Sequence, residues 1–165
     1  MKPNTKTLAA AGGFSVAGIA AAVALIGPHE GLRLDPYLDV VKKPTVCYGE
    51  TAVPMRRYTK AECGEILGRS IRKHGNDGIA KCLPAGLPPQ SQGAFLSVGY
   101  NIGVAAFCRS SISRKAMAGD LAGACRAISL YVYAGGKDCR IKANRCSGIP
   151  KRRADEQRLC EAGLG

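Results

Sequence analysis

The sequence predicts an α+β fold that is mainly helical, with a small β element near the front of the chain. The chain has 165 residues, a length that suits one compact domain with a buried core. From Thr59 to the end, apolar positions recur at helical spacing and are separated by glycine and proline. Strand-forming sequence is confined to residues 37–51. We therefore expect one helical domain that follows a short β segment.

An uncharged segment opens the chain. Residues 8–27, LAAAGGFSVAGIAAAVALIG, contain no charged residue and follow Lys2 and Lys6. A helix of about 20 residues rises roughly 30 Å, enough to cross the hydrocarbon core of a bilayer. Because most of these residues are alanine or glycine, the segment is only weakly apolar. It fits a cleaved signal peptide with AVA at 22–24 as the cleavage site, a permanent anchor, a signal-anchor that inserts and later leaves the membrane, or a plain buried helix.

Most later segments are expected to be helical. Thr59 is a good N-cap with Glu62 three residues on, so a helix should begin there. Its apolar stripe would consist of Ile66, Ile71 and Ile79. The prolines of LPAGLPPQ end this pattern, and the next helix should start near Ser91 and carry GAFLSVGYNIG. Helices are also expected over 105–120, 121–133 and 151–163, whereas 134–150 should be irregular.

The chain is strongly basic. It has 24 Lys and Arg against 12 Asp and Glu, a formal net charge of +12. Such a surplus indicates an anionic partner: nucleic acid, an anionic membrane face or an acidic polysaccharide envelope. Aromatic residues are few and tryptophan is absent, which disfavours a platform for stacking single-stranded nucleic acid. No nucleic-acid-reading motif is recognisable either, so we expect no nucleic-acid partner.

Eight cysteines stand at positions 47, 63, 82, 108, 125, 139, 146 and 160. They form no Cys-x-x-Cys pair and the chain has only two histidines, so we expect no metal site. An even number of scattered cysteines favours disulfides formed in an oxidising compartment. We expect Cys139 to pair with Cys146, and Cys125 with Cys160. The alternative is that several cysteines are buried free thiols.

Two acids and a hydroxyl follow the uncharged segment, in HEGLRLDPYLDVVKKPTVCYGET. Hydrolysis of a glycosidic bond requires one carboxylic acid that protonates the leaving oxygen and one carboxylate on the opposite side of the sugar ring. Glu30 lies at the foot of the apolar segment, a setting that keeps an acid protonated, whereas Asp39 lies in a polar loop. The Thr45 hydroxyl can hold the attacking water together with Asp39. The spacing alone leaves purely structural roles open, with Glu30 as a helix cap and Asp39 in a turn.

The run Glu30-Gly31-Leu32-Arg33, then Tyr37, Asp39, Thr45 and YGET, resembles the catalytic opening of the phage-type lysozymes, glycoside hydrolase family 24. GAFLSVGYNIG, AGDLAGAC, YAGGK and GIPKRRADEQRLC follow the family's order, so the resemblance spans residues 29 to about 161. It implies a lysozyme-like two-lobe fold, with a small β-containing lobe joined by a helix to a helical C-terminal lobe. It also implies a lysozyme (EC 3.2.1.17), an inverting muramidase without a cofactor. This enzyme would hydrolyse the β-1,4 bond between N-acetylmuramic acid and N-acetylglucosamine in peptidoglycan, with Glu30 as general acid and Asp39 and Thr45 positioning the water.

The resemblance implies three further residues that support the site, and at one position this chain differs from the family pattern. Arg152 matches an arginine that lies close to the catalytic glutamate in the family, and its alternative is the solvated face of a basic helix. Asn101 would line the cleft or cap a helix end, and Tyr48 would support the site. Family members often have a glycine between the aspartate and the threonine, where this chain has Lys42. The adjoining lysines would either suit an anionic substrate or hinder entry of the sugar.

The resemblance extends to phage endolysins with a signal-arrest-release segment, which leaves the bilayer before the glutamate joins the active site. It divides the chain into a signal-anchor, residues 1–28, and a lysozyme-like catalytic domain, residues 29–165. The protein would be exported, tethered to the inner membrane and then periplasmic, and monomeric when active. Because no cysteine precedes Cys47, retraction and refolding is the expected route rather than thiol exchange from the segment. The alternative function is a non-catalytic basic protein that binds membranes or the cell wall.

Overall fold

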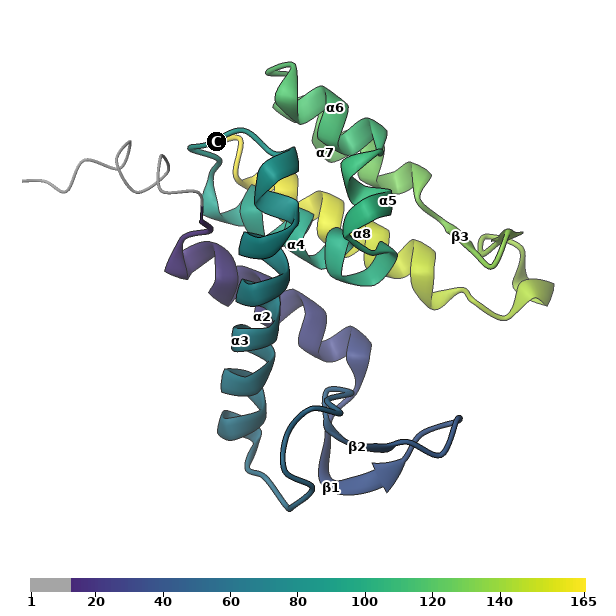
Figure 1. Ribbon diagram of the computed structural model, residues 1–165. Coiled ribbons are helices and arrows are strands. Elements are labelled where there is room, and N and C mark those ends of the chain that lie inside the picture. Colours follow the sequence, from purple (N-terminus) through teal and green to yellow (C-terminus); the bar gives the residue numbers. More distant parts are fainter. Residues whose placement is uncertain (1–12) are drawn as a thin grey trace, which may run out of the picture.

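The computed structural model describes residues 13–165 (Figure 1). Its α-helices are α2 (Val16–Glu30), α3 (Lys60–Asp77), α4 (Pro89–Ile102), α5 (Val104–Cys108), α6 (Ser111–Met117), α7 (Leu121–Ala127) and α8 (Gly148–Ala162). Short 3₁₀ turns cover η1 (Ile79–Cys82), η2 (Ile128–Leu130) and η3 (Lys142–Asn144). Two antiparallel hairpins pair β1 (Arg33–Leu38) with β2 (Pro44–Cys47), and β3 (Tyr133–Ala134) with β4 (Lys137–Asp138). The predicted α+β, mainly helical fold is confirmed.

Helix α2 includes residues 16–27 of the uncharged segment, which the structure describes from residue 13 onward. This helix packs into the hydrophobic core. The Ser15 hydroxyl caps it by accepting from the Gly18 N–H at 3.0 Å. Ile19, Ala22 and Ile26 are buried in the main hydrophobic core. A Cβ on Gly93 of α4 would lie 2.6 Å from the Ala21 Cβ, so this glycine permits a close approach of the two helices. Among residues 13–165 no helix combines the length and the apolarity needed to cross a membrane, and residues 1–12 lie outside the described part.

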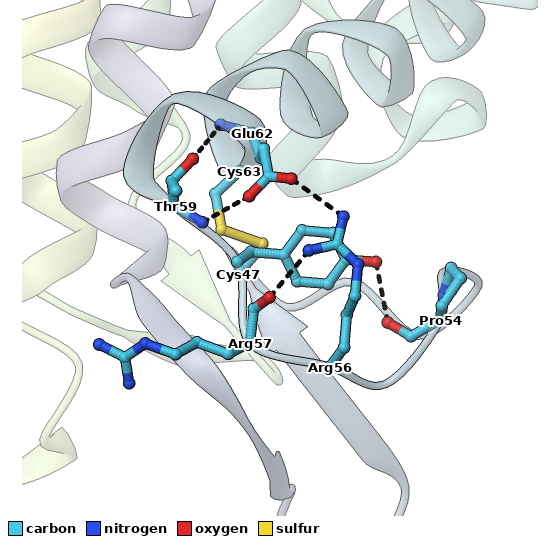
Figure 2. Close-up of a disulfide and its surroundings, with 8 residues drawn as sticks. Cys47, Pro54, Arg56, Arg57, Thr59, Glu62 and Cys63 are labelled. Carbon is cyan, nitrogen blue, oxygen red and sulfur yellow. Dashed lines mark hydrogen bonds and ion pairs between the residues drawn. A yellow bond between two sulfur atoms is a disulfide. The ribbon is translucent and has the colours of Figure 1, made fainter.

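Helix α3 joins the β1–β2 hairpin to the helical lobe (Figure 1). It begins where predicted, because Thr59 and Glu62 form a reciprocal capping box: the Thr59 hydroxyl accepts from the Glu62 N–H, and the Glu62 carboxylate from the Thr59 N–H. The Cys47–Cys63 disulfide ties β2 to the first turn of this helix (Figure 2). A small second core of Val46, Cys47, Tyr58, Cys63 and Ile66 surrounds that bond.

Helix α4 is the centre of the helical lobe. Seven consecutive residues, 93–99, are buried, and they include Phe95, Leu96 and Val98. Helices α2 and α8 pack against α4, and the short helices α5 to α7 complete the lobe (Figure 1). The two lobes and the connecting helix match the predicted lysozyme-like arrangement.

Several predicted boundaries are wrong. Strands are not confined to residues 37–51, because β1 begins at Arg33 and a second hairpin lies within the segment expected to be irregular. Gly135 and Gly136, with φ of +54° and +76°, supply the tight turn of that hairpin.

Helix α4 starts at Pro89, two residues before the predicted position near Ser91, since proline is tolerated in the first turn. The helix expected over 105–120 is broken, and its second part, α6, starts from the Ser110 cap. The helix expected over 121–133 ends at Ala127, and Ile79 lies in η1 but is buried as expected.

All eight cysteines are paired. The predicted bonds Cys139–Cys146 and Cys125–Cys160 are both present, and the latter joins α7 to α8. Cys47–Cys63 and Cys82–Cys108 complete the set, so the alternative of buried free thiols is wrong for these residues. Disulfides of this kind stabilise a small domain by restricting its unfolded state.

Candidate active site

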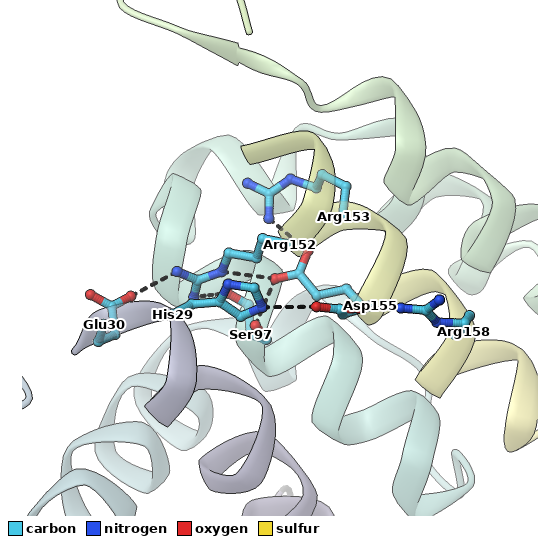
Figure 3. Close-up of polar contacts among 8 residues, drawn as sticks. His29, Glu30, Ser97, Arg152, Arg153, Asp155 and Arg158 are labelled. Carbon is cyan, nitrogen blue, oxygen red and sulfur yellow. Dashed lines mark hydrogen bonds and ion pairs between the residues drawn. The ribbon is translucent and has the colours of Figure 1, made fainter. Parts of the chain in front are cut away.

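Glu30 is the last residue of α2, where Gly31 ends the helix with a φ of +74°. Its carboxylate points toward α8, and Arg152 Nη1 of that helix donates to Glu30 Oε1 at 2.8 Å (Figure 3). The Arg152 side chain is only 5% exposed, whereas that of Glu30 is 28% exposed. One carboxylate oxygen is therefore held by a buried cation, while the side chain as a whole remains open to solvent.

Arg152 belongs to a buried charge network on α8 and α4. Its Nε donates to Glu156 Oε1 at 3.1 Å, and its Nη2 contacts the Ser97 carbonyl oxygen at 3.4 Å. Glu156 is fully buried and also accepts from Ser97 Oγ and from Arg153 Nη1, each at 2.6 Å. Every charge in this network has an opposite partner, which is the condition for burying ions without a large penalty. Arg152 therefore does not lie on a solvated helix face.

Arg153 connects the network to the end of α4. Its Nε donates to the Tyr131 carbonyl oxygen at 2.7 Å, and its Nη2 donates to Asn101 Oδ1. Asn101 is itself exposed at the surface of α4. Its amide is thus oriented by a buried arginine, and Gly103 rather than Asn101 caps this helix.

A pocket of about 380 Å³ lies over these residues. Its lining consists of His29, Glu30, Asn101, Cys146, Gly148, Ile149 and Arg152. Three of the predicted site residues, Glu30, Asn101 and Arg152, therefore share one cavity. The end of α2 contributes His29 and the Glu30 carboxylate, and α4 contributes the Asn101 amide. The first turns of α8, with Cys146 just before them, supply the arginine and the rest of the wall.

Asp39 and Thr45 lie together on the β1–β2 hairpin and do not line that pocket. Asp39 Oδ1 accepts from the backbone N–H groups of Val41 and Lys43, both at 2.9 Å, and Oδ2 accepts no bond from any described residue. Thr45 is buried, and its hydroxyl donates to the Lys43 carbonyl oxygen at 2.9 Å. The Asp39 Oδ2 atom and the acceptor lone pairs of the Thr45 hydroxyl thus have no hydrogen-bond partner among the described residues.

Lys42 occupies the place where the family pattern often has glycine, and it has a φ of +61°. This is the left-handed region, which glycine enters freely and a lysine enters at a cost. The turn keeps a conformation suited to glycine although it carries a bulky charged residue. Lys42 and Lys43 are both exposed beside Asp39.

Tyr48 does not line the pocket around Glu30. It lines a second cavity of about 830 Å³ between α2, the β lobe and the start of α3, together with Val23, Gly27 and Leu32. A Cβ on Gly27 would meet the Tyr48 ring at 3.5 Å, so this ring packs across the last turn of α2. Tyr48 thus lies in a different cavity from Glu30, Asn101 and Arg152.

Two further ionisable groups, both partly buried, have shifted pKa values. Burial raises the pKa of Glu50, and the charge of Arg69 and a hydrogen bond from Ser70 partly oppose this rise. Burial also raises the pKa of Tyr100, and the negative charges of Glu50 and Glu30 add to the effect. The Tyr100 phenol is therefore neutral at physiological pH and lies within the electrostatic reach of Glu30.

The sequence did not point to His29, Ser97, Arg153, Asp155 or Glu156 as part of this site. A signal for two of them, Arg153 and Glu156, existed: Arg153 precedes Glu156 by three residues and the predicted Arg152 precedes it by four, the spacing of helical ion pairs. That pattern is normally found on exposed helices, so it gives no indication that the pairs are buried.

Comparisons with known proteins point to one family. The family model described as phage lysozyme matches residues 27–156. The SAR-endolysin of Bacteriophage PS119 is 35% identical over 165 residues, covering 95% of this chain and 93% of the relative. The SAR-endolysin of Enterobacteria phage P21 is 34% identical over 170 residues, covering 97% of each. A crystal structure of a P22 lysozyme mutant has the same fold, with a TM-score of 0.72 and 24% identity over 93% of this chain and 99% of that one. The chain therefore belongs to the phage lysozyme family.

Proposed function

We propose that this protein is an endolysin of the signal-arrest-release type, a muramidase that lyses a phage host by hydrolysing peptidoglycan. The observation that carries the proposal is the setting of Glu30. This residue is the last of helix α2 and lines a pocket, and one of its carboxylate oxygens is bound by the buried Arg152. The bond cleaved is the β-1,4 linkage between N-acetylmuramic acid and N-acetylglucosamine, with inversion. Family membership and the similarity to two SAR-endolysins support this assignment.

In the proposed mechanism Glu30 protonates the oxygen of the leaving sugar. Arg152 holds Oε1, which leaves Oε2 to carry the proton and stabilises the carboxylate that remains after transfer. Asp39 uses its free Oδ2 as the base for the attacking water, while the Thr45 hydroxyl orients that water. The basic surface concentrates the enzyme on the anionic envelope.

We also propose that residues 1–28 form the signal-anchor and reside in the inner membrane first. After release, residues 16–30 pack as α2, which buries Ile19, Ala22 and Ile26 in the core beside α4. The active protein is then a periplasmic monomer that retains this segment. The weak apolarity of the segment supports release, because alanine and glycine gain little from hydrocarbon surroundings. In this scheme only the released form has Glu30 beside Arg152.

Loss of turbidity of outer-membrane-permeabilised bacteria tests the catalytic proposal. Glutamine at position 30 keeps the size of the side chain and cannot deliver a proton. The Glu30→Gln variant should therefore clear cells at least about 10²-fold more slowly than the wild type. Glu65→Gln, an exposed glutamate on α3, is the matched control and should behave as the wild type. Equal clearing by Glu30→Gln and wild type would refute the muramidase and favour the non-catalytic wall- or membrane-binding protein.

Fractionation of expressing cells tests the membrane proposal separately. The full-length chain should sediment with membranes of energised cells and appear in the periplasm, at unchanged mass, after an ionophore collapses the membrane potential. A shorter soluble product before that treatment would identify a cleaved signal peptide. Permanent sedimentation would identify a permanent anchor.

A further inference from the structure

The last turn of α2, which carries Glu30, is poorly stabilised by its own backbone. Pro28 lies inside the helix and has no N–H, so the Ala24 carbonyl loses its partner four residues on. Gly27 precedes it, and glycine is the least favourable non-proline residue in a helix interior. A catalytic acid needs a fixed position, so contacts from outside this turn must supply what its backbone lacks.

Two neighbouring side chains of this turn bind the same face of α8. His29 Nε2 lies 3.2 Å from Asp155 Oδ2, and Glu30 Oε1 lies 2.8 Å from Arg152 Nη1. Arg152 and Asp155 are three residues apart and therefore adjacent on the helix surface. The two contacts have opposite polarity: α2 provides an imidazole nitrogen at His29 and then a carboxylate oxygen at Glu30. Figure 3 shows both contacts side by side between the end of α2 and α8.

The His29–Asp155 contact is well shielded and specific. The side chains of His29 and Asp155 are 17% and 26% exposed. Asp155 is also bound by Arg158 from the next turn of α8, which holds its carboxylate in place. Among the described residues Asp155 is the acid that pairs with His29. The other charged groups nearby are Glu30 on α2 and Arg152 on α8, while α4 presents the neutral Asn101 to the same pocket.

We propose that His29 is a positioning residue for catalysis, which acts through Asp155 to hold the last turn of α2 so that Glu30 stays on Arg152. The inference rests on the proposed role of Glu30 as the acid. His29 does not transfer a proton to substrate in this scheme. At 3.2 Å from a carboxylate oxygen, a histidine Nε2 that carries a proton can act as a donor to that oxygen. A glutamine at this position can place its amide nitrogen close to where the histidine Nε2 lies.

The test compares kcat and KM on soluble peptidoglycan fragments for His29→Ala, Asp155→Ala, the double variant and His29→Gln, alongside thermal midpoints. His29→Ala and Asp155→Ala should each lower kcat about tenfold with KM nearly unchanged, because a misplaced acid slows chemistry more than binding. The double variant should lose no more than either single one, and His29→Gln should restore kcat to within about threefold. Gln157→Ala, elsewhere on α8, should leave kcat unchanged.

Three results would overturn the inference: a kcat for His29→Ala equal to that of the wild type, losses that multiply in the double variant, or no rescue by a folded His29→Gln variant. Glu30→Gln is run beside them. If that variant remains active, the proposed function itself has failed. If it is inactive and His29→Ala is not impaired, only the positioning role has failed.

Discussion

The two halves of the proposed catalytic machinery are held in different ways. Glu30 is fixed by a partner 122 residues away in the sequence, through a buried network between α2, α4 and α8. Asp39 is fixed by backbone groups two and four residues along its own hairpin. The acid is therefore in place only when α2 is docked in the helical lobe, whereas the water-positioning pair needs only a local turn. A release mechanism that controls α2 would for this reason control the acid.

The largest effect is expected from removing Glu156, the carboxylate that Arg152 and Arg153 share in the buried network. Glu156→Ala leaves Arg152 and Arg153 buried without their common partner, and we expect a loss of about 3–5 kcal/mol in the free energy of unfolding. Denaturant titration measures it, with Glu161→Ala at the exposed end of α8 as control. A loss below about 1 kcal/mol would show that the network contributes little to holding Glu30.

Asp39→Asn separates the structural and chemical roles of the hairpin aspartate. Asparagine keeps the side-chain oxygen that accepts from Val41 and Lys43, but lacks the negative charge that a base requires. We expect the rate of wall hydrolysis to fall at least about 10²-fold while the free energy of unfolding stays within about 0.5 kcal/mol. Asp39→Ala should lose the turn bonds as well. Retained hydrolysis by Asp39→Asn would leave this residue only its structural role.

Removal of the Cys47–Cys63 bond tests whether the β lobe is an independent unit. This bond closes a short loop of 16 residues, and its replacement by two alanines should cost about 2–3 kcal/mol. Amide hydrogen exchange should show faster opening of β1, β2 and the start of α3, with α4 and α8 unaffected. If α4 and α8 lose protection to the same degree, the two lobes unfold together. The β lobe would then not be stabilised independently of the helical lobe.

The difference between local contacts and contacts between distant segments also explains which features could be predicted from the sequence. The capping box at Thr59, the order of Glu30, Asp39 and Thr45, and the pairing of Cys139 with Cys146 are all local patterns that can be recognised without a fold. The burial of Arg152, Arg153 and Glu156 cannot be recognised in this way, because on its own α8 has the composition of an exposed charged helix. Only its packing against α4, η2, α7 and α2 in the folded protein covers these side chains. The β3–β4 hairpin was missed although its Gly-Gly turn is a local signal, because strands of two residues each have no periodicity to detect.

The weakest expected effect concerns Lys42, at the turn between Asp39 and Thr45. Because Lys42 has a φ of +61°, Lys42→Gly should relieve the conformational cost and raise the free energy of unfolding by about 1 kcal/mol. Lys43→Gly is the control: it removes the same charge, but Lys43 is not among the residues with positive φ, so glycine should destabilise there. Thermal melts measure both. If both glycine variants slow wall hydrolysis equally, the cationic charges beside Asp39 assist an anionic substrate. If only Lys42→Gly speeds it, the strained turn is what restrains the water-positioning pair.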